Sequence, residues 1–383
     1  MYHLTNQRRT ILLTFVIFAV QPIVLGGWFA LIPFVKASLG LTKTELAVTL
    51  LAMPLALIPT LQIASRVISR FGPRRMAYVF LPAQGVAACL PFLATGQNGL
   101  FAALAVFGMM GAFMQVSMNV YAGRLEKHLE RLVMSRCHGF WALGLAIGSG
   151  LAGVFGADAP LWTMMGLGIL SAIPGVFAAR ALPHLPGGAE ADDGAPAKRR
   201  IKDIPLKLYA IAGFAFSISM TEGAMSDWAA VYLAERLPAG ATYAGIAVTL
   251  YSASLAAGRF AGDSLKARLG AVGVARLTVG LAITGLVILV APLPLMFAYA
   301  GFVLIGLGAS VGFPVALSAV AGLDDRFEAQ NIALMSMLVI CGFLIGPPLI
   351  GILGDVFSLK VGLAVLIPAL GVSFVLAKQL QPK

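Results

Sequence analysis

Charged residues are scarce in this 383-residue sequence: Asp, Glu, Lys and Arg make up 11% of it, whereas 59% of the residues are hydrophobic. Soluble domains carry about 25% charged residues, so this chain lacks the side chains that a water-facing surface needs. Its apolar residues form long continuous runs, unlike the short alternating segments of a transmembrane β-barrel. The composition therefore predicts an all-α integral membrane protein.

Cysteines are also few, and Cys89, Cys137 and Cys341 lie far apart, without the spacing of a metal site or a disulfide framework. The sequence has no phosphate-binding loop, no zinc ligand set and no nucleophile–base pair at readable spacing. We expect no enzymatic activity, no cofactor and no metal. The net charge of +11 does not indicate nucleic acid as a partner, because the bases fall in short clusters between apolar runs.

Apolar runs long enough to cross a bilayer, which takes about 20 residues, recur along the whole chain. We predict twelve transmembrane helices, at residues 10–36, 43–65, 76–96, 98–122, 138–157, 160–181, 208–234, 241–262, 272–292, 294–320, 328–354 and 358–378. The lipid bilayer is therefore the first expected partner.

The basic residues orient these spans. Of the 27 Lys and Arg residues, all but Lys36, Lys43, Arg236 and Lys360 fall on one side. Cytoplasmic loops carry the excess of Lys and Arg in membrane proteins. We therefore expect a multi-pass protein of the cell (inner or plasma) membrane with both termini cytoplasmic.

One long polar segment divides the chain into two six-helix bundles, residues 1–182 and 208–383, joined by a cytoplasmic linker at 183–207. A short repeat supports this division. Arg70-Phe71-Gly72 follows the second span and Arg268-Leu269-Gly270 follows the eighth, 198 residues later. Two related six-helix halves are one common transporter architecture.

Glu222 and Asp227 are the acids of a segment that carries no other charge from Leu208 to Leu233. A carboxylate in hydrocarbon costs at least about 2.5–3.5 kcal/mol, so such acids usually face a cavity, a partner or a proton path. We expect Glu222 to couple transport to protons or to bind substrate. The alternative is a purely structural carboxyl, and Asp227 is either a second such acid or an outer-rim cap. The two lie on different faces unless the helix breaks, for which Gly223 gives an opportunity.

Further polar and aromatic side chains are candidates for the substrate site, although each could instead be a packing or rim residue. The full set of candidate substrate-binding residues is Gln21, Trp28, Gln115, Asn119, Tyr121, His138, Trp141, Glu222, Trp228 and Tyr251. Gln115 and Asn119 are four residues apart, hence on one helix face. His138 either shuttles protons or bonds a backbone carbonyl at the rim. The candidate set contains no Lys or Arg, and this lack of a buried cation argues against an anionic substrate.

Glycines with small-x-x-x-small spacing form a further pattern. They occur at Gly144 and Gly148 on the fifth span and at Gly308 and Gly312 on the tenth, while Gly342 and Gly346, followed by two prolines, mark the eleventh. Small residues let helices approach closely and slide. The pattern indicates either hinges for a rocking motion or simple tight packing.

The stretch from Ser65 to Arg75 resembles the basic loop signature of the major facilitator superfamily, with serines where that signature has its first glycine and its aspartate. Residues of this loop and of the matching loop of the second half are implied in gating: Arg70, Gly72, Arg74, Arg75, Arg259, Asp263 and Arg268. Residues 115–119, 134–138 and 222–228 are similar to the MosC/YbjJ-type branch, which is rhizopine-transporter-like and related to sugar permeases. The resemblance implies two six-helix bundles around a central cavity lined by spans one, four, seven and ten, with alternating access.

These observations predict a secondary active transporter for a small polar solute, such as a sugar, a polyol or a sugar derivative. Proton-coupled import is the favoured mechanism, with protons or another ion as the coupling partner and a monomer as the working unit. A proton-driven exporter of amphipathic compounds is the first alternative. A non-transporting membrane receptor or scaffold is the second.

Overall fold

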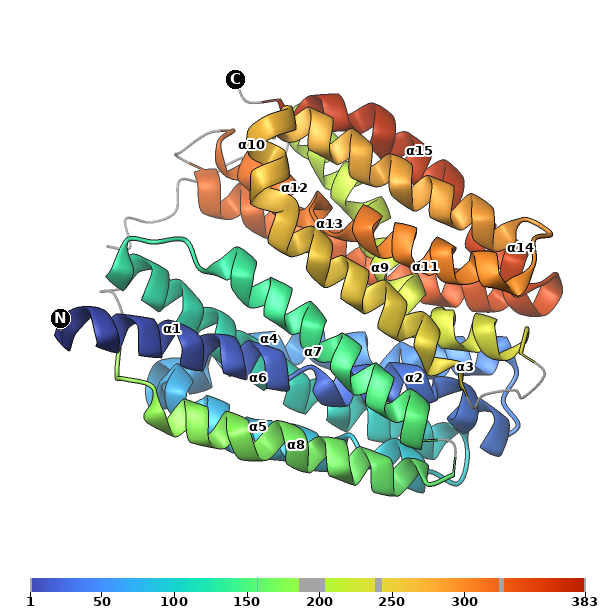
Figure 1. The fold of residues 1–383 in the computed structure, drawn as a ribbon, viewed down its shortest axis with the longest axis horizontal. Helices are drawn as coiled ribbons and strands as arrows, with labels where there is room; N and C mark the ends of the chain where they lie inside the picture. Colours follow the sequence, from blue (N-terminus) through green and yellow to red (C-terminus); the bar gives the residue numbers. More distant parts are fainter. Residues whose placement is uncertain (1, 157, 186–203, 238–242, 324–326, 382–383) are drawn as a thin grey trace.

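The structure of the chain, a computed structural model, describes residues 2–156, 158–185, 204–237, 243–323 and 327–381. Within these ranges the regular secondary structure is helical throughout and no strand occurs, so the all-α prediction is confirmed. Figure 1 shows long helices running roughly side by side, with the first eight helices in one group and the later ones in another.

The first group contains eight α-helices, and several predicted spans are built from two of them. The bounds are α1 (Tyr2–Val20), α2 (Ile23–Ser38), α3 (Lys43–Leu50), α4 (Ala52–Phe71), α5 (Pro73–Ala87), α6 (Gln97–Leu129), α7 (Met134–Phe155) and α8 (Pro160–Ala181). A 3-10 turn at Leu90–Leu93 extends α5. The first span changes from α1 to α2 at Gln21 and Pro22, where proline has no N–H to continue the hydrogen-bond ladder.

The second group follows the same plan. Its helices are α9 (Leu206–Ala234), α10 (Gly245–Val290), α11 (Leu295–Ala309), α12 (Gly312–Ala321), α13 (Glu328–Val356), α14 (Leu359–Ala364) and α15 (Leu366–Leu376), with a final 3-10 turn at Ala377–Leu380. Most of the predicted linker, at 186–203, lies outside the described residues, so the predicted bundle boundaries stay a prediction.

Ten helical stretches of the described residues are long and apolar enough to cross a membrane. One of them, the 46-residue α10, is interrupted at Gly270, whose φ of 70° separates two helical segments. The 29-residue α9 is not among the ten and adds a further helix of membrane-spanning length. If the two segments of α10 are counted separately and α9 is added, the described helices make up twelve spans, which is the number that the sequence predicts.

The repeat at offset 198 reappears in the backbone. Gly72 and Gly270 both have positive φ, 81° and 70°, and both stand between two helices. Only glycine adopts this region without strain, which accounts for its presence in both halves. An added Cβ would meet nothing within 4 Å at either position, so conformation and not crowding requires the glycine.

Glycines at the same offset also bring helices together. An added Cβ on Gly144 of α7 would overlap the carbonyl oxygen of Ala19, and one on Gly342 of α13 would lie 2.6 Å from the carbonyl oxygen of Phe216 in α9. One turn later, Gly148 faces the carbonyl of Ile23 in α2 and Gly346 faces Met220 in α9. In both halves the fifth span therefore packs backbone-to-backbone against the first.

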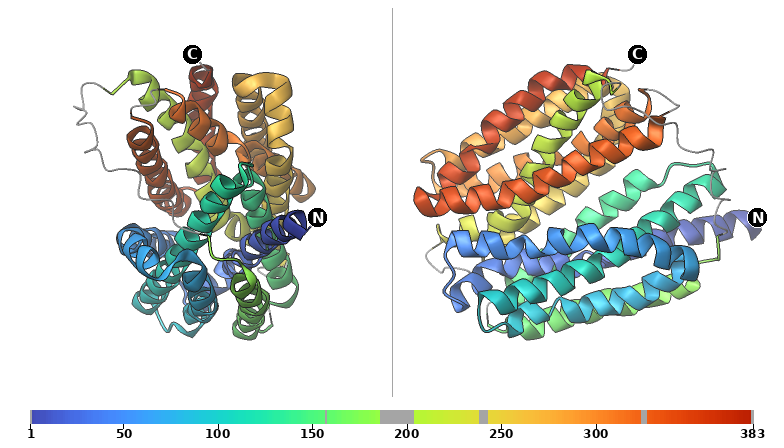
Figure 2. Two further views of the ribbon diagram at one scale, coloured as in Figure 1. Left: turned by 90° about the vertical axis from the view of Figure 1, so that its left-hand side faces the viewer. Right: turned by 180° about the vertical axis from the view of Figure 1, so that it is seen from behind.

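The two groups of helices meet at the end of the molecule that carries α3 and the C-terminal end of α13 (Figure 2). There the Asp355 carboxylate accepts the main-chain N–H groups of Lys43 (3.0 Å) and Thr44 (2.6 Å), the first residues of α3. The Lys43 ammonium also pairs with Glu235 at 3.0 Å. We call Lys43, Thr44, Glu235 and Asp355 the end contact.

A second contact between the groups runs along α7 and α10. The hydroxyls of Ser149 and Thr249 lie 3.0 Å apart, and an added Cβ on Gly153 would be 3.6 Å from the Cα of Gly245. Hydrogen-bonded hydroxyls and bare glycine backbones let these two helices touch without large side chains between them.

Two separate glycine-to-alanine variants test whether close backbone contact requires glycine at these positions. In Gly144→Ala the new methyl group meets backbone that cannot move aside, so we expect thermal unfolding in detergent to shift down by an amount corresponding to about 1–3 kcal/mol. Gly166→Ala in α8 is the matched control, because nothing lies within 4 Å of its added Cβ. It should be neutral or slightly stabilising, since alanine is favoured over glycine in helices by about 1 kcal/mol. Equal melting points for the two variants would contradict the account.

Candidate functional site

The site is centred on an ion pair between the first two long helices of the second group. Glu222 of α9 and Arg259 of α10 lie with one guanidinium nitrogen 3.5 Å from both carboxylate oxygens. Their side chains are 17% and 12% exposed. Charges inside a membrane protein are costly unless they are paired, and this pairing stabilises both. Arg259 also donates to the main-chain carbonyl of His138 in α7 at 3.4 Å, which connects the pair to the first group of helices.

The position of Arg259 corrects one expectation from the sequence. The eighth span was predicted to end at residue 262, which put Arg259 at the cytoplasmic edge. In the structure the helix continues to Gly270, eleven residues beyond Arg259. The expectation of a site without a buried cation is therefore wrong, and the argument that it gave against anionic groups on the substrate no longer holds.

Aromatic rings bridge the two groups of helices, and two of them, Phe140 and Phe260, follow His138 and Arg259 closely in the sequence. Phe140 of α7 stacks on Phe15 of α1, with centroids 4.7 Å apart, and meets Phe260 of α10 edge-on at 5.4 Å. The Phe260 ring also occupies the space that a side chain at Gly139 would fill. Such rings present apolar surface next to charged groups, a combination suited to a solute with both polar and apolar faces.

Gln21, Gln84 and Trp141 form a hydrogen-bonded row inside the first group. The Gln21 amide nitrogen donates to Gln84 at 3.1 Å, and its oxygen accepts from the Trp141 indole at 2.9 Å. Gln21 and Gln84 are 2% and 1% exposed, whereas Trp141 is half-buried. Gln21 therefore orients Trp141, and of these three Trp141 is the side chain most open to a solute.

Three other aromatic candidates are fully packed. The Trp228 indole donates to the Pro347 carbonyl at 3.1 Å and thereby ties α9 to α13. Trp28 and Tyr251 are 0% and 2% exposed, and neither the Trp28 indole N–H nor the Tyr251 hydroxyl has a partner among the described residues. Tyr251 lies on α10, eight residues before Arg259 on the same helix.

Asp227 is separate from the ion pair. Helix α9 runs unbroken through Gly223, so Glu222 and Asp227 stay on different faces, and no hydrogen bond or ion pair reaches Asp227 from the described residues. Gln115 is exposed on α6, while Asn119 is half-buried and its amide oxygen has no partner in the described part of the chain. Their roles in binding stay predictions.

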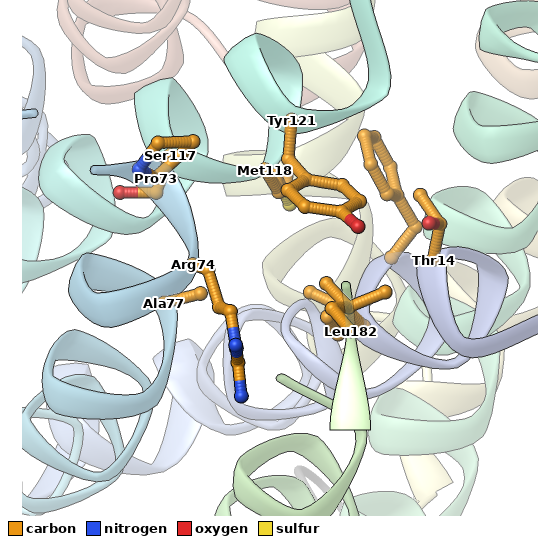
Figure 3. Close-up of a pocket in the computed structure, with 10 residues that line it drawn as sticks. Thr14, Pro73, Arg74, Ala77, Ser117, Met118, Tyr121 and Leu182 are labelled. Atoms are coloured by element: carbon orange, nitrogen blue, oxygen red, sulfur yellow. The ribbon is translucent and has the colours of Figure 1, made fainter. Parts of the chain in front are cut away.

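Tyr121 lies away from the ion pair, at the end of the first group. Its hydroxyl donates to the Pro183 carbonyl at 3.0 Å. Figure 3 shows it above Leu182, between Thr14 of α1 and Arg74 of α5, around a small cavity of about 10 Å³.

His138 is half-buried, and its ring meets Phe18 edge-on with centroids 5.7 Å apart. The histidine contributes its backbone carbonyl, and not its ring, to the contact with Arg259.

The predicted gating residues, apart from Arg259, lie at the ends of helices. Arg74 donates to the carbonyls of Ala179, at 3.2 Å, and Arg180, which holds the start of α5 against the end of α8. Arg70, Arg75, Asp263 and Arg268 are exposed. The sequence reading missed Gln84, Phe140 and Phe260, although a lone glutamine inside the third apolar run was a visible signal for the first of them.

The ion pair makes a prediction about stability. In Arg259→Gln the Glu222 carboxylate loses its cation, so we expect the free energy of unfolding to fall by about 1.5–3 kcal/mol, the range for a hydrogen bond to a charged group. The double variant Glu222→Gln/Arg259→Gln, with no uncompensated charge, should recover a large part of that loss in thermal unfolding at neutral pH. Additive losses in the double variant would show that the two side chains do not interact.

Comparison with known proteins relates this arrangement to transporters. The family model described as Major Facilitator Superfamily matches residues 10–322. The chain is 28% identical over 353 residues to a protein of Sinorhizobium fredii described as uncharacterized transporter y4wD, covering 90% of each chain. It is 26% identical over 358 residues to membrane protein MosC of Rhizobium meliloti, covering 93% of this chain and 86% of MosC.

Solved structures show the same fold at low identity. A mutant of the nucleoside transporter NupG matches with a TM-score of 0.74 at 13% identity, over 97% of this chain and 98% of the other. A bacterial homologue of the lysosomal transporter Spinster, in an inward-facing and unoccupied conformation, matches with a TM-score of 0.67 at 12% identity, over 98% and 97%. With twelve membrane spans among its described helices and a family match over residues 10–322, this chain belongs to the Major Facilitator Superfamily of transporters.

Proposed function

We propose that this chain is a proton-coupled secondary transporter that imports a small polar solute, a sugar, polyol or sugar derivative, by alternating access. The observation that supports this most is the Glu222–Arg259 pair, enclosed between helices and bonded to a carbonyl of the other group. If the pair served only to stabilise the fold, apolar side chains could do the same, since a protein with a buried ion pair is often no more stable than one with hydrophobic residues in its place.

The pair supplies both parts of a coupling reaction. When Glu222 is ionised it holds Arg259, and when Glu222 takes up a proton the guanidinium is released to donate to a solute. Hydroxyl oxygens of a sugar or polyol accept such hydrogen bonds, and a carboxylate or other acidic group on the sugar derivative would accept them more strongly. Proton and solute then occupy the same site together, as symport requires.

The aromatic and amide groups near the pair fit this class of solute. Trp141, oriented by Gln21, and the rings of Phe140 and Phe260 offer apolar faces. Sugars and nucleosides carry a hydrogen-bonding edge and an apolar face. Nucleosides belong in the substrate screen because NupG, a nucleoside transporter, shares the fold.

The end contact supports alternating access. Placing both termini in the cytoplasm, as the basic residues predict, puts Lys43, Thr44, Glu235 and Asp355 on the outer side. The structure would then represent a conformation closed to the outside. Opening it requires the Asp355 carboxylate to leave the start of α3, and this step would expose the site to the external solution.

Coupling is tested with Glu222→Gln in membrane vesicles. We expect accumulation of the labelled solute under an imposed pH gradient to fall at least about tenfold, because Gln cannot bind and release the proton. Solute exchange without a gradient should persist. Asp158→Asn is the control, because Asp158 is exposed. Unchanged gradient-driven uptake in Glu222→Gln would refute the coupling role, and gradient-driven efflux in the wild type would favour an exporter of amphipathic compounds.

The end contact is tested with Asp355→Ala. The carboxylate adds a cap to the N-terminus of α3, and losing such a cap costs about 1 kcal/mol, or about fivefold in a conformational equilibrium. We expect a cysteine introduced at Ala47, which is 0% exposed and faces Gly351, to react several-fold faster with an impermeant maleimide. The measurement uses right-side-out vesicles and a protein without its native cysteines, with Asp158→Ala as control. No change in the labelling rate would refute the role of Asp355.

A further inference from the structure

A basic cavity lies at one end of the first group of helices, well apart from the ion pair. Its volume is about 710 Å³. It is enclosed by the end of α4, the start of α5, the last part of α6 and the segment after α8. Its lining residues are Ser69, Arg70, Phe71, Gly72, Pro73, Arg74, Arg75, Tyr78, Tyr121, Arg124, His184 and Leu185.

The described lining carries positive charge. Arg70, Arg74, Arg75 and Arg124 line the cavity, and none of the other described lining residues is Asp or Glu. The ion pairs found among the described residues involve none of these arginines. Four like charges around one space repel one another, and an anion bound between them would remove that repulsion.

The four arginines differ in their hydrogen bonds and exposure, and these differences show which of them can bind a ligand. Arg74 is already engaged with the carbonyls of Ala179 and Arg180, and Arg124 donates weakly to the Leu185 carbonyl at 3.5 Å. Arg70 and Arg75 are exposed, and the recorded contact of Arg70 is the face of the neighbouring Phe71 ring, 5.4 Å away. Their guanidinium groups therefore have donors free for a ligand.

The backbone adds a second and independent feature. Helix α5 begins at this cavity with Pro73 in its first turn and Gly72 as its cap, so no side chain caps its N-terminus. The Ser69 hydroxyl is engaged with the Arg66 carbonyl at 2.8 Å and does not reach the helix. The main-chain N–H groups of Arg74 and Arg75 thus have no hydrogen-bond acceptor among the described residues. Helix N-termini of this kind bind phosphate groups through aligned N–H donors and the helix dipole.

We propose that this cavity binds a phosphate-bearing anion, held by Arg70, Arg75 and the N-terminus of α5. Guanidinium groups bind phosphate oxygens through paired hydrogen bonds, which suits phosphate better than a simple halide ion. The phosphate belongs either to the headgroup of an anionic phospholipid or to a small soluble phosphate. Basic pockets between helices on the cytoplasmic side of a membrane protein bind lipid headgroups. This site is separate from the proposed transport site and does not depend on its function.

The experiment uses the full chain in detergent and follows its melting temperature. One arm adds inorganic phosphate against sodium chloride of the same ionic strength, and the other adds phosphatidylglycerol against phosphatidylcholine in mixed micelles. We expect one of the two phosphate sources to raise the melting temperature by several degrees, with an apparent affinity at least tenfold weaker in Arg70→Gln/Arg75→Gln. Native mass spectrometry should show phosphatidylglycerol retained by the wild type and lost in the variant if the lipid is the ligand.

Two controls keep the result interpretable. Arg66→Gln removes an exposed arginine one turn earlier on α4, outside the lining, and should bind as the wild type does. Arg70→Lys/Arg75→Lys keeps the charge and should restore part of the affinity. Stabilisation by phosphate only identifies a soluble ligand, and stabilisation by phosphatidylglycerol only identifies a lipid. No stabilisation by either source, or equal binding in the Gln double variant and the Arg66→Gln control, would overturn the proposal.

Discussion

Close approach of helix backbones is the constraint on which this structure depends. In a bilayer the lipid tails are as apolar as the side chains, so helices associate through van der Waals contact and hydrogen bonds and not through the hydrophobic effect. Gly144 and Gly148 in one half, and Gly342 and Gly346 in the other, supply that contact. The same device joins the halves, where Gly153 of α7 lies against Gly245 of α10. Helices held by bare backbone can shift against each other with few side chains in the way.

Within this frame the charged groups are placed where they have partners. Glu222 and Arg259 come from neighbouring helices of the same half, yet Arg259 also reaches the His138 carbonyl of the other half. A change in the charge of Glu222 therefore alters the electrostatic environment of Arg259, the residue that also makes a contact between the halves. The end contact at Asp355 uses the opposite arrangement, with a carboxylate of one half against a helix N-terminus of the other.

Several elements could be predicted from residues alone. Apolar runs located the twelve spans, and the match between Arg70-Phe71-Gly72 and Arg268-Leu269-Gly270 indicated an internal repeat, at which the structure has two glycines with positive φ. Glu222 stood out as an acid inside an apolar run, and the structure places it in an ion pair. Arg259 was placed at the cytoplasmic edge of the eighth span because hydropathy falls at a charged residue whether the helix ends there or continues. Tyr121 and Trp228 were predicted for the site, and the structure shows that each donates a hydrogen bond to a backbone carbonyl.

The sequence by itself determined the class of protein, the number of spans and the internal repeat, because these follow from composition and from the length of an apolar run, which are local properties. Tertiary structure alone decided that Arg259 meets Glu222, that Gln21 orients Trp141 and that four arginines surround one cavity. The first two pairs join residues 37 and 120 positions apart on different spans. Their geometry depends on how each helix is rotated and where it crosses its neighbours, and side-chain packing sets both.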